Sequence, residues 1–99
     1  MQIAEFQRLI EAIYLEKDRA RGSAGTFRWF VEEVGELAHA LRADPLGAQG
    51  RERMAEEFAD VLAWLSTLAS IHGVELEAAV RKYTGGCPKC QGTPCRCEE

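Results

Sequence analysis

The chain has 99 residues, enough for one small domain with a modest core, and a formal net charge of −4 at pH 7. An acidic chain has no general attraction to phosphate backbones, so we expect no nucleic-acid partner. No apolar run reaches the roughly 18 residues that span a membrane, and acidic residues interrupt the N-terminal segment where a signal peptide would be apolar. These features exclude a membrane protein and predict a cytoplasmic one.

Two amphipathic helices are predicted in the first half of the chain. Apolar residues recur at helical spacing from Ile3 up to the segment RARGSAG, in which Gly22 and Gly25 indicate a turn. The same spacing continues over residues 27–41, and this second helix must end before Pro45, whose ring cannot continue it. The glycines therefore divide this half of the chain into two helices.

Two further helices are predicted in the second half. The apolar pattern resumes at Met54, and Gly73 is well placed to terminate this third helix. The segment VELEAAVRKY at 74–83 supplies a short fourth helix before two glycines open the tail. The sequence therefore predicts an all-α, antiparallel bundle of about four helices in residues 1–84 and a Cys-rich tail in residues 85–99.

The second and third predicted helices carry acidic stripes that mirror one another. The order is W-x3-E-x2-E on the second helix and E-x2-D-x3-W on the third, formed by Trp29, Glu33, Glu36, Glu57, Asp60 and Trp64. Residues three and four apart share one face of a helix, so each stripe is continuous. If the helices form an antiparallel hairpin about Leu46 and Gly47, the tryptophans lie level and four carboxylates meet at one height.

Such a cluster of carboxylates is costly without a cation. Like charges a few ångströms apart repel, and neither stripe places a Lys or Arg between its acids. Oxygen ligands without histidine or thiolate suit Mg²⁺ or Mn²⁺, which leave coordination positions for water and phosphate. The alternative interpretation is that both stripes are solvated acidic faces, which are common on helices.

The acids also carry a resemblance to a known family. EEVGEL at 32–37, followed by EFADVL at 57–62, resembles the ExxE and ExxD signature of the MazG-like family of all-α nucleotide pyrophosphohydrolases. This resemblance implies hydrolysis of a nucleoside triphosphate between its α and β phosphates, which gives a monophosphate and pyrophosphate. By matching positions it implies Mg²⁺ ligands at Glu33, Glu36, Glu57 and Asp60.

Two acids are candidates for a catalytic role. Glu32 matches the first acid of the family's frequent EExxE form, and with Glu33 it is placed to orient or deprotonate the attacking water. An exposed position in solvent is the alternative for Glu32. Which nucleotide is hydrolysed cannot be deduced from these residues, because the chain has no evident base-reading motif.

Basic and aromatic residues supply candidates for substrate binding. Arg28, Arg81 and Lys82 could complete charge neutralisation at the phosphates, although most surface cations serve only solubility. Trp29 or Trp64 could stack on a base, and a core or subunit contact is the alternative for either side chain. Arg28, Trp29 and Lys82 are the predicted substrate-binding residues.

Apolar arcs on the second and third helices are wider than a small monomer readily covers, so we expect a homodimer or homotetramer, as the resemblance also implies.

Two rival interpretations of the function remain. A di-iron carboxylate bundle would use Glu36-x-x-His39, but His39 points about 60° away from the acidic stripe. A non-enzymatic helical scaffold would not explain why four mutually repelling carboxylates lie together.

The tail GGCPKCQGTPCRCEE has four cysteines with the spacing C-x2-C-x4-C-x-C. Four thiolates in one short loop suit tetrahedral Zn²⁺, and CPKC resembles half of a zinc ribbon. The C-x-C pair is tighter than the usual C-x2-C, so a reduced flexible tail and disulfides remain alternatives. The expected zinc ligands are Cys87, Cys90, Cys95 and Cys97, and in the scaffold hypothesis this tail is an interaction module.

Overall fold

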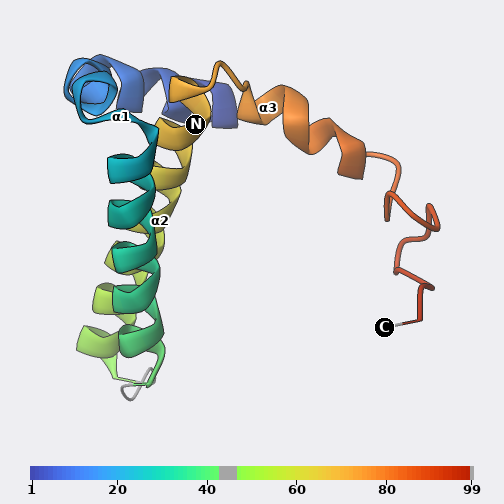
Figure 1. The fold of residues 1–99 in the computed structure, drawn as a ribbon. Coiled ribbons are helices and arrows are strands. Elements are labelled where there is room, and N and C mark those ends of the chain that lie inside the picture. Colours follow the sequence, from blue (N-terminus) through green and yellow to red (C-terminus); the bar gives the residue numbers. More distant parts are fainter. Residues whose placement is uncertain (43–46, 99) are drawn as a thin grey trace.

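The computed structural model describes residues 1–42 and 47–98, and every regular element in these ranges is helical. The elements are α1 (Ile3–Arg42), α2 (Ala48–Ile71), α3 (Leu76–Ala79) and the 3₁₀ helix η1 (Val80–Tyr83). The second half of α1 and the whole of α2 form an antiparallel hairpin. Residues 76–98, which begin with α3, form an arm that extends away from this hairpin (Figure 1). The all-α prediction is confirmed, but the bundle of about four helices is replaced by three α-helices and one 3₁₀ helix.

A single glycine kinks α1 where two separate helices were expected. Gly22 has φ 86° and ψ 172°, a conformation that L side chains rarely adopt, whereas Gly25 lies within the helix. The N-terminal segment of α1 therefore lies across one end of the hairpin instead of continuing along it (Figure 1). The predicted turn is real, but it requires one residue and not a loop.

A glycine and two backbone hydrogen bonds terminate α2. Gly73, with φ 70°, donates its N–H to Ser70 O at 3.1 Å, and Val74 N–H reaches Ala69 O at 2.8 Å. These two bonds form a Schellman motif, which confirms the predicted end of this helix.

At the other end of the hairpin, α2 begins at Ala48, earlier than the apolar pattern at Met54 indicated. Large apolar residues are missing between Ala48 and Met54, and a pattern of such residues cannot detect turns that contain none. The predicted hairpin turn included Leu46, which lies with Pro45 outside the described residues.

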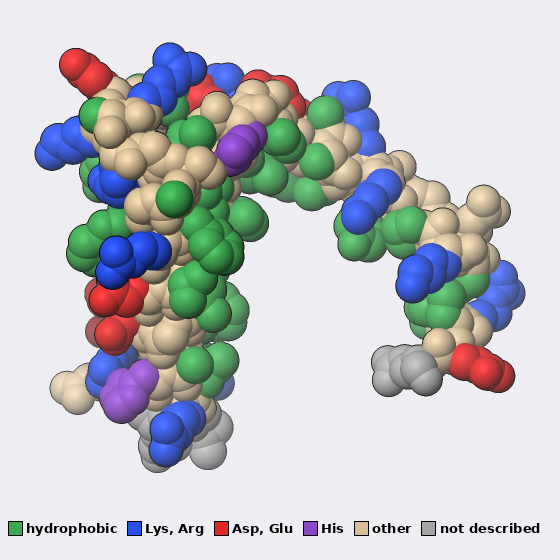
Figure 2. All heavy atoms as spheres, in the orientation of Figure 1, with side chains coloured by type: hydrophobic (Ala, Val, Ile, Leu, Met, Phe, Trp, Pro, Cys, Tyr) green, Lys and Arg blue, Asp and Glu red, His purple; other side chains and the backbone are tan. Residues whose placement is uncertain are grey.

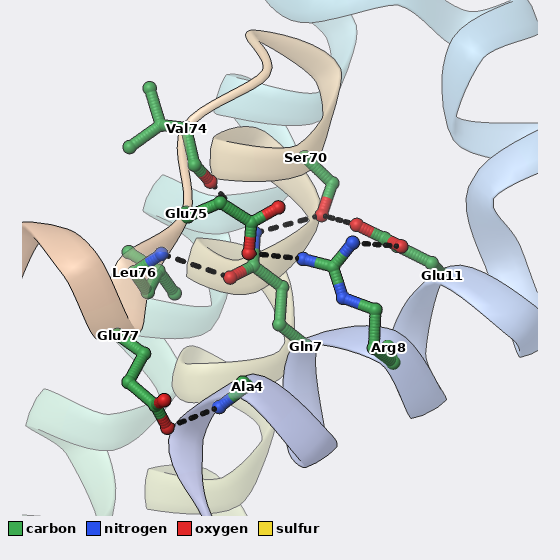
Figure 3. A network of polar contacts seen from close by, with 9 residues as sticks. All are labelled: Ala4, Gln7, Arg8, Glu11, Ser70, Val74, Glu75, Leu76 and Glu77. Carbon is green, nitrogen blue, oxygen red and sulfur yellow. Dashed lines mark hydrogen bonds and ion pairs between the residues drawn. The ribbon is translucent and has the colours of Figure 1, made fainter.

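A buried amide fastens the N-terminal segment of α1 to the end of α2 (Figure 3). Gln7 is 1% exposed and donates from Nε2 to Ser70 Oγ at 3.1 Å and to Val74 O at 2.8 Å. Its Oε1 accepts the N–H of Leu76 at 3.0 Å, and the Ser70 hydroxyl donates to Glu11 at 2.7 Å. Because these bonds join α1 to α2, to α3 and to the segment between them, the network fixes the crossing of the N-terminal segment over the hairpin.

The described chain buries little apolar surface. Ile10 and Ala40 are its buried apolar residues, while large apolar side chains along the hairpin stay exposed: Phe27, Val31, Val34, Leu41, Phe58, Leu62 and Leu65. Figure 2 shows such side chains along much of the hairpin. The Cα radius of gyration is 16.0 Å, whereas a compact chain of this length has about 13 Å. None of the described helices is both long enough and apolar enough to cross a membrane.

Candidate active site

Three of the predicted acidic ligands converge where α1 and α2 face each other. Glu33 on α1 and Glu57 and Asp60 on α2 each place a carboxylate oxygen within 4.8 Å of the other two. These three residues are called the acidic cluster below. Glu36 lies outside this distance, but its charge still acts on Glu33. The antiparallel register predicted from the two stripes therefore brings carboxylates from both helices to one place.

The electrostatics of the cluster disfavour further negative charge. Burial raises the pKa of Glu33 above its ordinary value, and the negative charges of Asp60, Glu57, Glu36 and Glu32 raise it further. Each of these causes penalises the ionised form. A bound cation would reverse the effect of all four neighbouring carboxylates.

One buried oxygen of the cluster lacks a hydrogen-bond partner among the described residues. This atom is Glu57 Oε2. Burial of a carboxylate oxygen without a partner is costly, and a metal ion is one way to compensate it. Two ligands at the usual Mg–O distance of about 2.1 Å are at most about 4.2 Å apart. The cluster therefore needs only a small contraction to hold such an ion, and its all-oxygen donor set fits Mg²⁺ or Mn²⁺.

A tryptophan pair lies beside the acids. Trp29 and Trp64 stack with ring centroids 6.0 Å apart and an interplanar angle of 10°, which confirms that these residues are level in the hairpin. The Arg21 guanidinium lies 5.1 Å from the centroid of the Trp64 ring. Trp29 thus contacts the other helix and remains 47% exposed.

A pocket of about 300 Å³ opens next to the acidic cluster. It is lined by Tyr14, Lys17, Asp18, Arg21, Asp60, Ala63, Trp64 and Thr67. Asp60 belongs to both the pocket and the cluster, so the cations Lys17 and Arg21 line a cavity that begins at the acids. This combination suits a ligand with anionic groups that must approach a metal.

Sequence reasoning missed Lys17 and Arg21. They lie before residues 32–62, which carry the ExxE and ExxD motifs, and their position depends on the kink at Gly22. The i, i+4 spacing of the two cations on one helix face was the available signal. Spacing alone, however, does not indicate which helix that face meets.

Arg21 is held in place by a buried carboxylate. Asp18 is 3% exposed, and its oxygens accept bonds from Arg21 Nη1 and Thr67 Oγ1, each at 3.0 Å. Arg21 Nη1 also reaches Thr26 Oγ1 at 3.4 Å. Asp18 therefore joins the two helices and orients the guanidinium at the wall of the pocket.

The predicted substrate-binding residues fall into two groups. A second pocket, of about 230 Å³, is lined by Arg21, Gly25, Arg28, Trp29 and Glu32. Lys82 instead lies in η1 on the arm, where its Nζ is 5.1 Å from the Tyr83 ring. The structure thus brings Arg28, Trp29 and Glu32 together near the acids and leaves Lys82 elsewhere.

The histidines do not join the acids among the described residues. The cluster that contains Glu33 consists only of carboxylates, and His39 is exposed. His72 pairs with Ser23 through Nε2 and Oγ at 2.7 Å. A di-iron site of the carboxylate and histidine type therefore lacks its nitrogen ligands here.

The four cysteines of the tail form a separate cluster, with all four Sγ atoms within 4.8 Å of one another. Hydrogen bonds from the backbone of Arg96 and Gly92 lower the pKa of Cys90 to about 6. Hydrogen bonds with the other three thiols raise the pKa of Cys97 to about 11. The tail therefore favours at least one thiolate at neutral pH.

The chain resembles known proteins over most of its length. The sequence model of the MazG nucleotide pyrophosphohydrolase domain matches residues 21–91. The uncharacterized protein YvdC of Bacillus subtilis (strain 168) is 29% identical in an alignment 97 positions long, which covers 84% of this chain and 90% of that protein. The matched range of the domain includes the whole acidic cluster.

Proposed function

The chain belongs to the MazG nucleotide pyrophosphohydrolase family, and on this premise we propose that it hydrolyses a nucleoside triphosphate to a monophosphate and pyrophosphate in the cytoplasm. The observation that carries the proposal is the buried Glu57 oxygen of the acidic cluster, which has no hydrogen-bond partner in the part of the chain that the structure describes. In a scaffold that binds no ligand, the cost of burying this oxygen would remain without compensation. The proposed ligands of Mg²⁺ or Mn²⁺ are Glu33, Glu36, Glu57 and Asp60.

A divalent cation bound there would neutralise phosphate charge and lower the pKa of water. The residues of the chain supply the remaining functions. In the proposed reaction the oxygen of water attacks the α phosphorus, its proton passes to Glu32 or Glu33, and the bond to the β phosphate breaks to release pyrophosphate.

Arg21 and Lys17 are proposed to bind the phosphates. Both line the pocket that begins at Asp60, and the bond to Asp18 fixes the direction of the Arg21 guanidinium. A prepositioned cation loses little side-chain entropy when an anion arrives. Arg28 and Trp29, in the second pocket, are proposed to contact another part of the same nucleotide.

The first experiment is a panel of common and modified nucleoside triphosphates, assayed with Mg²⁺ or Mn²⁺ for release of pyrophosphate. We expect at least one member to yield monophosphate and pyrophosphate in equal amounts, and chelation to stop the reaction. The release of orthophosphate alone, or no turnover of any member, would contradict the proposed reaction.

Two lysine variants then locate the phosphate-binding cation within the same assay. Lys17→Gln is expected to raise KM by roughly tenfold, because a hydrogen bond to a charged group contributes about 1.5 kcal/mol or more. Lys82→Gln is the matched variant on the arm and is expected to change KM little. A large rise in KM for Lys82→Gln with little change for Lys17→Gln would instead favour Lys82, the residue predicted from the sequence.

The exposed apolar side chains of the hairpin support a homodimer or homotetramer. A second copy that covered Phe27, Val31, Phe58 and Leu62 would supply the core that one described chain lacks. Light scattering of the full chain at micromolar concentration should therefore give at least twice the monomer mass of 11.0 kDa. A monomer that persists on concentration would refute the assembly while leaving the hydrolase proposal to its own assay.

A further inference from the structure

We propose that the C-terminal loop is a structural zinc site in which Cys87, Cys90, Cys95 and Cys97 bind one Zn²⁺ ion. The site is separate from the acidic cluster, because the loop ends the arm that leads away from the hairpin (Figure 1). Its role is to fold residues 85–98 and not to take part in nucleotide hydrolysis. Residues 1–84 and 85–99 are correspondingly proposed as a helical domain and a metal-folded tail.

The sulfur positions have the spacing of a tetrahedral site. Cys87 and Cys97 have Sγ atoms 3.7 Å apart, and those of Cys90 and Cys95 are 3.9 Å apart. Four sulfurs at about 2.3 Å from one zinc are separated by about 3.8 Å along each edge of a tetrahedron. The two measured pairs share no residue, so they correspond to opposite edges. A disulfide would instead require a separation of about 2.05 Å, and all four thiols are free.

Glycines allow the loop to close tightly enough to gather the thiols. A Cβ atom at Gly86, where φ is 102°, would lie 2.8 Å from Gln91 O, and one at Gly92 would lie 2.8 Å from Pro94 O. Between these glycines, Cys87 N–H donates to Gly92 O at 3.0 Å, and Gln91 N–H donates to Cys87 O at 2.6 Å. The backbone therefore makes a compact turn that L side chains at either glycine would open.

Backbone N–H groups donate to two of the four sulfurs. Arg96 N–H donates to Cys90 Sγ at 3.2 Å, and Cys97 N–H donates to Cys95 Sγ at 3.3 Å. Such donors orient metal-binding sulfurs and offset their negative charge. The second bond also explains how the unusual C-x-C pair works, because Cys97 directs its amide to Cys95 while its own sulfur approaches Cys87.

The loop has no apolar core that could fold it without an ion. Within residues 85–98 the only buried residue is Gly92, yet ordering a residue costs about 1–2 kcal/mol in backbone entropy. For small metal sites the free energy of ion binding supplies this cost directly. Four sulfur donors without oxygen select zinc over magnesium.

The test begins with the full chain, purified without added zinc and without a metal-affinity tag. Elemental analysis should give one zinc per chain. Cys90→Ser and Cys97→Ser should each lose the stoichiometric zinc, whereas the exposed neighbour Glu98, changed to Gln, should leave it in place. Absence of zinc from the parent, bound iron in its place, or unchanged zinc in both cysteine variants would overturn the proposal.

A second measurement separates a structural ion from a catalytic one. Removal of zinc by a chelator should speed amide hydrogen exchange across residues 86–98 and leave protection in α1 and α2 unchanged. Glu57→Gln, which alters the acidic cluster, should still bind one zinc per chain. Exchange in the loop that does not respond to chelation would refute the structural role, whatever the outcome of the hydrolysis assay.

Discussion

Glu57→Gln is expected to abolish metal-dependent nucleotide hydrolysis while leaving the metal-free protein equally or more stable. The substitution keeps the shape of the side chain and removes one negative charge from a site where carboxylates lie within 4.8 Å of one another. A metal contributes several kcal/mol to stabilising a phosphoryl transition state, so the loss of a ligand should lower kcat/KM on the order of a thousandfold. Stability should rise by on the order of 1 kcal/mol, because like-charge repulsion falls.

The measurements are steady-state kinetics and thermal melts with and without Mg²⁺. Mg²⁺ should raise the Tm of the parent through binding to the folded state and should raise that of the Glu57→Gln variant less. Glu56, the exposed neighbour on α2, provides the matched control, and Glu56→Gln should retain both activity and the response to Mg²⁺. Full activity and an equal response in the Glu57→Gln variant would show that the acids are solvated faces.

The same cluster gives the metal-free protein a defined dependence on pH. The pKa of Glu33 is raised in the folded state, so its contribution to stability is fully present below the unfolded value of 4.5 and is lost as pH rises through the folded pKa. Chemical denaturation of metal-free protein should therefore show this loss above pH 4.5. Glu33→Gln should remove that part of the slope, and saturating Mg²⁺ should reverse it in the parent.

Asp18→Ala should destabilise the protein more than any exposed acidic substitution. Asp18 is buried and accepts hydrogen bonds from both Arg21 and Thr67, so its removal leaves two donors without their partner. Breaking a buried ion pair costs about 3–5 kcal/mol. Because the Arg21 side chain is 29% exposed and can be rehydrated, we expect about 2–3 kcal/mol. KM should also rise, since Arg21 loses the contact that orients it.

Denaturant titration at a fixed protein concentration measures this loss. Glu16→Ala, an exposed substitution on the same segment of α1, is the matched control and should stay within about 0.5 kcal/mol of the parent. Asp18→Asn should fall between the two, because an amide oxygen can still accept one of the bonds. A loss in the Asp18→Ala variant no larger than in the control would show that the buried pair does not hold the helices together.

The parts of the site that sequence predicted are those that depend on helix periodicity. Glu33, Asp60 and the stacked tryptophans meet because residues three and four apart share a face, and an antiparallel hairpin aligns two mirrored stripes. The start of α2 at Ala48 was missed because its first turns carry no large apolar residue to mark them.

The parts that could not be predicted depend on the direction of the chain after a glycine. Lys17 and Arg21 reach the pocket because Gly22 turns the N-terminal segment across the hairpin. Lys82 lies on the arm because the chain leaves α2 at Gly73 in a direction that no local pattern encodes. One dihedral angle at each glycine redirects a whole segment, and neither composition nor spacing determines that angle.

The stacked pair of Trp29 and Trp64 gives the protein an optical reporter of its own. These are its two tryptophans, so all of its indole fluorescence arises where α1 and α2 face each other beside the acids. Two coupled indole rings at a centroid distance of 6.0 Å respond to any change in the spacing or tilt of the helices. Tryptophan emission of the unlabelled chain therefore follows the hairpin itself, while the cysteine loop, which holds no tryptophan, adds nothing to that emission.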